Sequence, residues 1–377
     1  MSMGALQSGI QPDLINTVLP AEILRQIFSL LPPADLRSLL LVCQLWREVG
    51  ESPGLWTWAM VRATSLNMSS MPKRLAMRKM MRVGSLTLEA GVEMSEELLE
   101  TMDRHPGLRR MVMRRLDMAL VRPARLTGLL NRLTAITFIE TELTSEQLLA
   151  IFTSRDRSSE PWSRKKQGPL TFLDLTGNDL SIIEPKLLAS VVNKLQYMVM
   201  KNSCLKPEQV NAVLRSTSVV TSLQGLDIGH NNLSSVEPKL LAGAVTKIKD
   251  VRLNWARLSV PQIEAILDSV NKGTQLKKLS LRGNVAAPRI QTKLLIDALD
   301  RLEEMDLALT RPTLQQTCAV LMALKDCTDS WSLKEIFGKE EKHLIYKFVR
   351  AKSPILIMDF SFRQQSPYQW LFTKLNV

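Results

Sequence analysis

The sequence predicts an α/β protein in which a small all-α module is followed by a curved solenoid of parallel strands and helices. Three observations predict this class: apolar stripes punctuated by prolines near the start of the chain, a leucine-containing motif that recurs through its middle, and an aromatic-rich final segment. In such a solenoid the parallel strands are concave, the helices are convex, and a C-terminal cap covers the open end of the core. A length of 377 residues also favours several structural units over one core.

The first module, residues 19–56, predicts three short helices. Pro20 suits the start of a helix, and Pro32 and Pro33 end the segment that follows. Between these prolines, apolar residues form one stripe at helical spacing: Ile23, Leu24, Ile27, Phe28 and Leu31. A second helix begins near Asp35, whose carboxylate suits a helix N-terminus. So short a module buries only part of its surface, so we expect some of the stripe to contact a partner.

The spaced residues of this module resemble an F-box. The resemblance is carried by Leu-Pro-x-Glu-Ile-Leu from Leu19, Asp35-Leu36, Val42-Cys43-x-x-Trp46-Arg47 and the closing Leu55-Trp56. It implies docking to the Skp adaptor of a Skp–cullin–F-box ubiquitin ligase, and to a cullin through that adaptor. Carried over by position, the adaptor-binding residues would be Leu19, Pro20, Ile23, Leu24, Ile27, Leu36, Val42 and Trp46. For any single one of these residues, packing within the module's own core is an equal alternative.

The middle of the chain repeats the pattern Leu-x-x-Leu-x-Leu-x-x-Asn-x-Leu. The clearest copies begin at Leu170, Leu223 and Leu276, and weaker copies begin at Val83, Leu108, Leu133, Leu195, Ile248 and Leu302. The segment Glu-Pro-Lys-Leu-Leu-Ala at 184–189 returns 53 residues later, so the underlying repeat is a pair of 25 and 28 residues. This alternation resembles the ribonuclease-inhibitor class of leucine-rich repeats, which implies a horseshoe with full helices on its convex face.

Each strand of the repeats should be followed by a helix. Prolines stand where the first helical turn is expected, at Pro185, Pro207, Pro238, Pro261 and Pro288. Three segments predict capping boxes: Ser181-x-x-Glu184, Ser234-x-x-Glu237 and Thr144-x-x-Gln147. The asparagines of the motif, Asn178, Asn231 and Asn284, are predicted to satisfy backbone groups of the turn and to have no binding role.

The open face of the strands is the candidate substrate-binding surface, because alternate residues of a strand point to the same face. By this count the candidate residues are Arg110, Arg114, Phe172, Asp174, Tyr197, Lys201, Asp227, Arg252, Trp255 and Arg282. Arginines beside exposed aromatic residues have the composition of a protein-binding region. For most of these positions taken singly, simple solvation is the alternative.

The predicted domains are a flexible arm at 1–15, the F-box at 16–62, a basic linker helix at 63–82, leucine-rich repeats at 83–326 and an aromatic cap at 327–377. Polar residues at 153–169 predict a projecting loop within the repeats, either a recognition element or a tolerated insertion. In the cap, alternating apolar residues at 355–362 predict a final strand.

The chain is basic, with 49 Lys and Arg against 37 Asp and Glu and a formal charge of +12. Much of the excess lies at 73–125, where arginines outnumber acids. Because guanidinium groups match phosphate and carboxylate geometry, this region predicts a surface for an acidic or phosphorylated protein segment. Nucleic acid also fits the sign of the charge, but the sequence has no nucleic-acid-binding module.

Catalytic and metal chemistry are not indicated. His105, His230 and His343 are isolated, and there is no phosphate-binding glycine loop. The cysteines Cys43, Cys204, Cys318 and Cys327 form no metal-ligand set, so we expect no metal or other cofactor and reduced, mostly buried thiols. No secretory signal or membrane span is indicated, which predicts a cytoplasmic or nuclear protein without membrane contact.

The sequence therefore predicts a non-catalytic, substrate-recognition subunit of a Skp–cullin–F-box ubiquitin ligase, with an unidentified protein substrate held on the repeats. Two alternatives remain open. The chain could form a structural scaffold with the Skp adaptor without ligase activity, or it could be a basic leucine-rich-repeat protein that binds nucleic acid.

Overall fold

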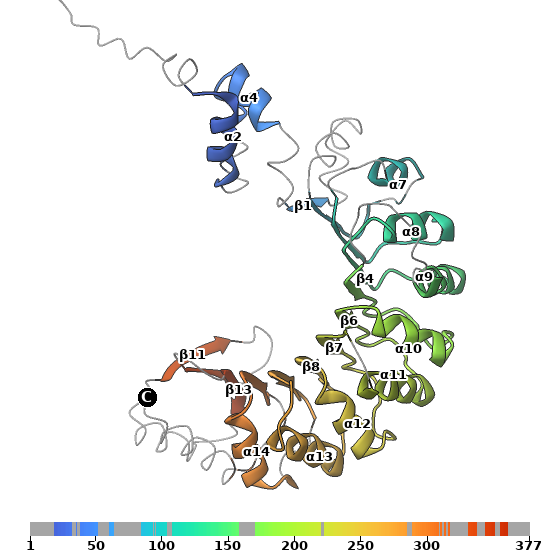
Figure 1. Ribbon diagram of the computed structural model, residues 1–377, viewed down its shortest axis with the longest axis vertical. Helices are drawn as coiled ribbons and strands as arrows, with labels where there is room; N and C mark the ends of the chain where they lie inside the picture. Colours follow the sequence, from blue (N-terminus) through green and yellow to red (C-terminus); the bar gives the residue numbers. More distant parts are fainter. Residues whose placement is uncertain are drawn as a thin grey trace, which may run out of the picture. The chain divides into compact units, whose positions relative to one another are not determined.

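The computed structural model places helices before a long series of strand–helix units (Figure 1). It describes residues 19–31, 35, 38–51, 60–63, 84–92, 94, 96–103, 108–157, 170–219, 222–284, 289–308, 310, 313, 316, 331–337, 344–350 and 355–360. The chain divides into two compact units, Met1–Val112 and Met113–Val377. Strand β3 (Arg110–Arg114) contains the point of division.

The first unit begins with helices α2 (Ala21–Ser29) and α4 (Gln44–Gly50), which confirms the first and third predicted helices. Leu24 and Phe28, one turn apart on α2, are buried. The Phe28 ring packs edge-on against Trp46 of α4, with 5.3 Å between the ring centroids. Cys43 is the N-cap of α4, and its sulfur accepts a hydrogen bond from the Trp46 backbone N–H at 3.5 Å.

A parallel strand pair follows these helices, and its first strand was not predicted from the sequence pattern. Strand β1 (Met60–Ala63) pairs with β2 (Ser85–Leu88), with Met60 opposite Ser85. The first strand therefore lies at the boundary predicted between the F-box and the linker. Helix α7 (Glu96–Asp103) follows β2. The predicted linker helix and the predicted arm lie outside the described residues, apart from the last residue of β1.

In the second unit, each neighbouring pair of strands from β4 to β10 is parallel. These strands are β4 (Ala135–Ile139), β5 (Phe172–Asp174), β6 (Tyr197–Val199), β7 (Gly225–Asp227), β8 (Asp250–Arg252), β9 (Lys278–Ser280) and β10 (Glu304–Asp306). These strands, like β2 and β3, each begin two residues after a predicted repeat start. The repeat register is thereby confirmed, and from Leu108 onward the first apolar residue of each motif is buried just before its strand.

The helices of the second unit lie on the outer side of an arc whose inner side is formed by the strands (Figure 1). They are α8 (Pro123–Leu130), α9 (Ser145–Arg157), α10 (Pro185–Asn193), α11 (Pro207–Val219), α12 (Pro238–Val245), α13 (Val260–Asn271) and α14 (Thr292–Leu299). Leucine, valine and isoleucine side chains from strands and helices fill the core between the two layers. The strand–helix alternation is the one expected of a leucine-rich-repeat solenoid.

Prolines fix the starts of several helices, as predicted. Pro185, Pro207 and Pro238 are the first residues of α10, α11 and α12, and Pro261 is the second residue of α13. Pro288 lies outside the described residues.

Only one of the three predicted capping boxes forms. Thr144 and Gln147 make both reciprocal bonds, with the Thr144 N–H donating to Gln147 Oε1 at 2.9 Å. The boxes predicted at Ser181 and Ser234 are wrong, because Glu184 and Glu237 are themselves the N-cap residues of α10 and α12. The proline after each glutamate sets the helix start three residues later than a box requires.

The predicted loop at 153–169 starts later than expected. Helix α9 continues to Arg157, so residues 153–157 are helical rather than part of a loop. No glycine or proline interrupts the chain from Ser145 to Arg157, and the helix has no reason to end at Thr153. Residues 158–169 lie outside the described part of the chain.

Three strands follow the last repeat: β11 (Trp331–Phe337), β12 (Leu344–Arg350) and β13 (Ile355–Phe360). Strand β13 pairs in parallel with β10, and β12 lies antiparallel between β13 and β11. The predicted final strand is confirmed over Ile355–Phe360. It covers the hydrogen-bonding edge of β10, which is the role expected of a cap.

The asparagines of the motif are structural, as predicted. Asn231 is buried, and its Nδ2 donates to the Met200 carbonyl of the preceding unit at 2.8 Å and to the Ile228 carbonyl of its own turn at 3.0 Å. Its Oδ1 accepts the backbone N–H groups of Ser203 and Leu205. Asn178 and Asn284 occupy the same place in their own units.

Buried glutamines have the same role at the intervening boundaries. Gln209 Nε2 donates to the carbonyls of Leu180 and Ile183 in the preceding unit at 2.7 and 2.6 Å. Its Oε1 accepts the Lys206 N–H at the start of α11. Asparagine and glutamine thus alternate from one unit boundary to the next. We call these buried side chains the inter-unit amides: Gln147, Asn178, Gln209, Asn231, Gln262, Asn284 and Gln316.

Candidate functional site

Helix α2 has two apolar faces, one buried in the module and one exposed to solvent. Ile23 is 39% exposed and Ile27 43% exposed, and Leu30 continues the same line just past the helix end. By contrast Leu24, on the buried face, is 1% exposed. The residues are spaced by three and four, so the exposed side chains are neighbours on the helix surface.

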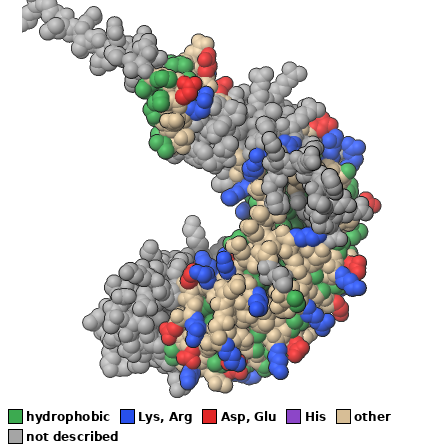
Figure 2. All heavy atoms as spheres, in the orientation of Figure 1, with side chains coloured by type: hydrophobic (Ala, Val, Ile, Leu, Met, Phe, Trp, Pro, Cys, Tyr) green, Lys and Arg blue, Asp and Glu red, His purple; other side chains and the backbone are tan. Residues whose placement is uncertain are grey.

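The segment before α4 extends the exposed apolar surface with Leu41 and Val42. Hydrophobic side chains gather over α2 and α4 in Figure 2. Large apolar side chains scattered singly over a surface are ordinary, but a group of this kind on so small a module marks an interaction site.

The predicted adaptor-binding residues therefore fall into different environments. Pro20, Ile23, Ile27 and Val42 are exposed, Leu19 and Trp46 are half-buried, and Leu36 lies outside the described residues. Leu24 fills the core of the module, so in this structure its side chain is covered and cannot contact a partner as predicted. The sequence pattern did not indicate Leu30 and Leu41, which are also exposed in this region. The spacing of Leu30 from Ile23 and Ile27 would have indicated it.

The segment that contains α2 and α4 is similar to a known protein family. Residues 17–60 match the model of the F-box-like family. The matched range contains α2 and α4 and ends at the first residue of β1. We refer to it as the F-box-like domain. No curated protein matches the chain.

The open face of the strands carries aromatic and charged side chains, unlike the exposed apolar surface of the F-box-like domain. Phe172 and Tyr197, on the neighbouring strands β5 and β6, have ring centroids 6.3 Å apart. Tyr197 is 38% exposed and lies over Gly225 of β7, where a Cβ would overlap its ring. The glycine thus leaves the space that the tyrosine ring occupies.

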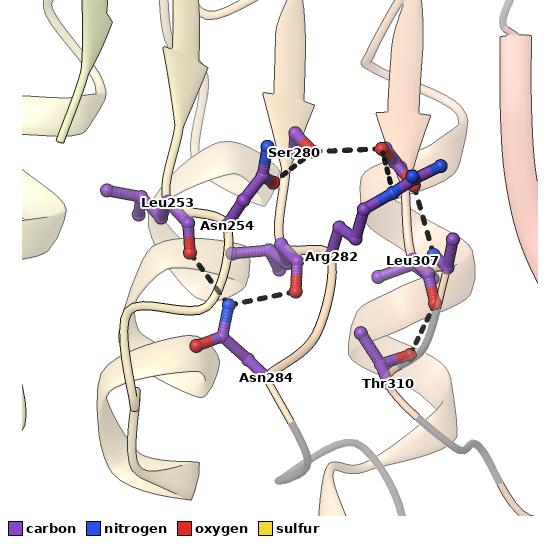
Figure 3. A network of polar contacts seen from close by, with 10 residues as sticks. Leu253, Asn254, Ser280, Arg282, Asn284, Leu307 and Thr310 are labelled. Atoms are coloured by element: carbon purple, nitrogen blue, oxygen red, sulfur yellow. Dashed lines mark hydrogen bonds and ion pairs between the residues drawn. The ribbon is translucent and has the colours of Figure 1, made fainter. Parts of the chain in front are cut away.

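The charged residues of β8 to β10 are largely joined in ion pairs. Arg252 pairs with Asp250 at 3.4 Å, and Lys278 pairs with Glu304 at 3.2 Å. Arg282 pairs with Asp306 at 3.2 Å. The last pair belongs to a network in which the Ser280 hydroxyl lies within hydrogen-bonding distance of the side-chain oxygens of Asp306 and Asn254, while Asn284 bonds backbone carbonyls of the turn (Figure 3). The predicted binding residues Arg252 and Arg282 are therefore neutralised by neighbours on the protein.

The predicted residues Asp174 and Asp227 brace the turns at the ends of their strands. Asp174 Oδ1 accepts the Thr176 N–H and hydroxyl at 2.9 and 2.6 Å, and Asp227 Oδ1 accepts the Gly229 N–H at 2.9 Å. Burial raises the pKa of both carboxyl groups, although these hydrogen bonds act in the opposite direction. Both side chains are half-buried rather than presented to solvent.

Basic side chains occupy both ends of β3. Arg110 and Arg114 are exposed and lie on the same side of the strand, with Val112 between them. Arg114 is close enough to Asp174 to lower the pKa of that carboxyl group. The next residue, Arg115, is paired with Glu140 at 3.0 Å.

A column of left-handed residues follows the strands, one per unit. Each residue has φ between 51° and 73°, and the backbone N–H of each donates to a carbonyl of the next unit. The column consists of Arg115, Glu140, Gly177, Asn202, His230, Trp255 and Gly283. Trp255 is 44% exposed, and its ring centroid lies 6.2 Å from that of His230. The sequence placed Trp255 at this rim but did not reveal the left-handed backbone.

No metal-binding group of three His, Cys, Asp or Glu side chains occurs among the described residues. Within the same residues, no helix is long and apolar enough to span a membrane. Cys204 is exposed and Cys43 half-buried, which corrects the expectation that the thiols are mostly buried. Cys204 lies between β6 and α11 and has a φ of 52°. The other two cysteines lie outside the described residues.

Proposed function

We propose that this chain is the substrate-recognition subunit of a Skp–cullin–F-box ubiquitin ligase. The observation that carries the proposal is the exposed apolar face of the F-box-like domain, where Ile23, Ile27 and Leu30 are 39%, 43% and 85% exposed. Burying such side chains against a partner helix stabilises a complex by about 25 cal/mol for each Å² of apolar surface removed from water. The partner that the F-box resemblance implies is the Skp adaptor.

The role of the repeats follows from their architecture. Each unit boundary is closed by its own amide and leucine core, so the strand face can vary without loss of the scaffold. The chain would hold a protein substrate on this face, near a recruited enzyme charged with ubiquitin. The catalytic contribution is proximity, because a tethered lysine has a high effective concentration.

The adaptor interface is tested by co-purification of the full chain with the Skp adaptor and a cullin. Changing Ile23→Asp and Ile27→Asp together should abolish adaptor and cullin capture while leaving the melting temperature unchanged, because both side chains are exposed. Leu24→Asp is the contrasting variant: it should lose capture through unfolding, because Leu24 is buried. Capture of the adaptor without a cullin would instead identify a non-ligase scaffold.

The basic residues of β3 support an acidic or phosphorylated substrate segment. Arg110 and Arg114 are both exposed on one side of the strand, where guanidinium groups can bind carboxylate or phosphate. Proximity labelling would first supply bound partners. Arg110→Glu with Arg114→Glu should then weaken capture of a phosphorylated partner, but not of the adaptor. Arg215→Glu, an exposed arginine on the outer helix α11, is the matched control and should change neither.

A further inference from the structure

Trp255 has a backbone conformation that its side chain does not favour. Its φ is 53°, in the left-handed region that bulky residues rarely adopt. Three positions of the left-handed column hold the residue types that tolerate this region best, at Gly177, Asn202 and Gly283. The others hold Arg115, Glu140 and His230, so Trp255 is the one large apolar side chain among the seven residues of the column. A strained tryptophan that the fold could replace with asparagine points to a function for its ring.

The neighbouring units hold the ring in place. Gly283, the next residue of the column, lies against one part of the indole, and a Cβ there would overlap the ring. On the other side is His230, with its ring centroid 6.2 Å away. The Trp255 N–H donates to the Arg282 carbonyl at 2.8 Å, and the His230 N–H donates to the Asn254 carbonyl at 2.6 Å. Trp255 is thus fixed on both sides and still 44% exposed, which is the state of a preorganised anchor site.

The charges around this ring select the occupant. Arg252, at the end of β8, and Arg282, just after β9, are already paired with carboxylates of the protein. Burial, and the nearby charge of Lys201, lower the pKa of His230 below its ordinary value and so favour the neutral imidazole, although Asp227 acts in the opposite direction. A cationic side chain would meet Arg252 and Lys201 here, while the carboxylates of Asp250 and Asp306 are paired and that of Asp227 is half-buried and accepts the Gly229 N–H. An aromatic ring meets no such charge repulsion and can pack on the indole at the usual 4.5–7 Å spacing.

We propose that Trp255 is the anchor position of the substrate face and that it binds an aromatic side chain of the protein substrate. The inference rests on the proposed function and deepens it by naming a recognition determinant. It adds an apolar anchor to the basic surface of β3, so that the bound segment would present acidic or phosphorylated residues in one part and an aromatic residue in another.

The test uses the full chain and three pools of fluorescent nonapeptides with a fixed central Phe, Ala or Lys and random flanking residues. By fluorescence anisotropy, the Phe pool should bind about fivefold or more tightly than the Ala pool. Trp255→Asn should remove this preference, and its melting temperature should be equal or higher because asparagine suits the left-handed backbone. Ile182→Asn, which alters a loop side chain that is also 44% exposed, should keep the preference.

Equal binding of the Phe and Ala pools, tightest binding of the Lys pool, or a preference that survives in Trp255→Asn would overturn the proposal. A marked fall in the melting temperature of Trp255→Asn would also overturn it, since the ring would then serve packing. Failure of the proposed function is a separate result: the unmodified chain would not capture the Skp adaptor, whatever its peptide preference.

Discussion

The F-box-like domain and the repeats differ in how far their large apolar side chains are exposed to solvent. In the domain, Ile23 and Ile27 face solvent from a helix whose other face is already packed. In the repeats, the leucines of the motif are almost completely buried, and the inter-unit amides are hydrogen-bonded across the unit boundaries. The domain therefore leaves apolar surface in water that a partner could cover, whereas each repeat packs against its neighbours. This difference is the one expected if the domain docks the adaptor and the repeats serve as a scaffold, as we propose.

The largest effect is expected at an inter-unit amide. Asn231→Ala removes hydrogen bonds to carbonyls of two units and from two backbone N–H groups, all of them buried. We expect the free energy of unfolding to fall by about 3 kcal/mol, because each buried group left without a partner costs about 1 kcal/mol or more. Urea denaturation of the full chain measures this change.

Asn232→Ala is the matched control, because Asn232 is the adjacent residue, is exposed and bonds only to Ser234 in its own loop. It should cost less than about 1 kcal/mol. If the two variants lost equal free energy of unfolding, the inter-unit amides would not be what holds the units together. The repeats would then not differ from the F-box-like domain in the way described above.

A smaller effect is expected at a helix cap. Ser259 and Gln262 form a capping box at the start of α13, with the Ser259 N–H donating to Gln262 Oε1 at 2.8 Å. Ser259→Ala should destabilise the fold by about 1 kcal/mol. Ser234→Ala is the comparison, because the sequence around Ser234 resembles a capping box although α12 begins only after Glu237. This variant should lose only a few tenths of the stability lost by Ser259→Ala. Thermal unfolding distinguishes the two, and the reverse order would contradict the helix starts.

The smallest effect concerns pH. Burial raises the pKa of Asp227 above its ordinary value of 3.8, so the folded protein binds this proton more tightly than the unfolded chain does. The stabilisation from that proton is complete below 3.8 and is lost as the pH rises through the folded pKa. Asp227→Asn should therefore be at least as stable as the unmodified chain at pH 7, with an advantage that shrinks toward pH 4. An advantage that grows on acidification would show that the ionised carboxylate is the favoured form.

The repeat pattern predicts the strands well because one physical requirement repeats in every unit. The leucine two residues before each strand must enter the same core, so the starts at Leu170 and Leu223 place β5 and β7 without further information. Helix starts were predictable where proline fixes them, as at Pro185. The box predicted at Ser181 failed because a capping pattern does not specify which residue is the first helical one.

The candidate sites were less predictable, because they depend on what lies in the next unit. The inter-unit glutamines stand fourteen residues after alternate repeat starts, a regularity visible in the sequence, but the carbonyls they bond belong to the preceding unit. Likewise, the pairing of Arg282 with Asp306 depends on the registry of two strands. The exposure of Ile27 beside the burial of Leu24 depends on how α2 packs against α4, and hydrophobicity alone cannot separate the two.

The most direct test compares two side chains of equal exposure in the two regions. Ile27 on α2 and Leu149 on α9 are each 43% exposed. Binding of the full chain to the Skp adaptor is measured by isothermal titration calorimetry for Ile27→Asp and Leu149→Asp. We predict that Ile27→Asp weakens adaptor binding by about tenfold or more, equivalent to about 1.4 kcal/mol, while Leu149→Asp leaves it unchanged. Equal affinities for the two variants, or no adaptor binding by the unmodified chain, would contradict this prediction.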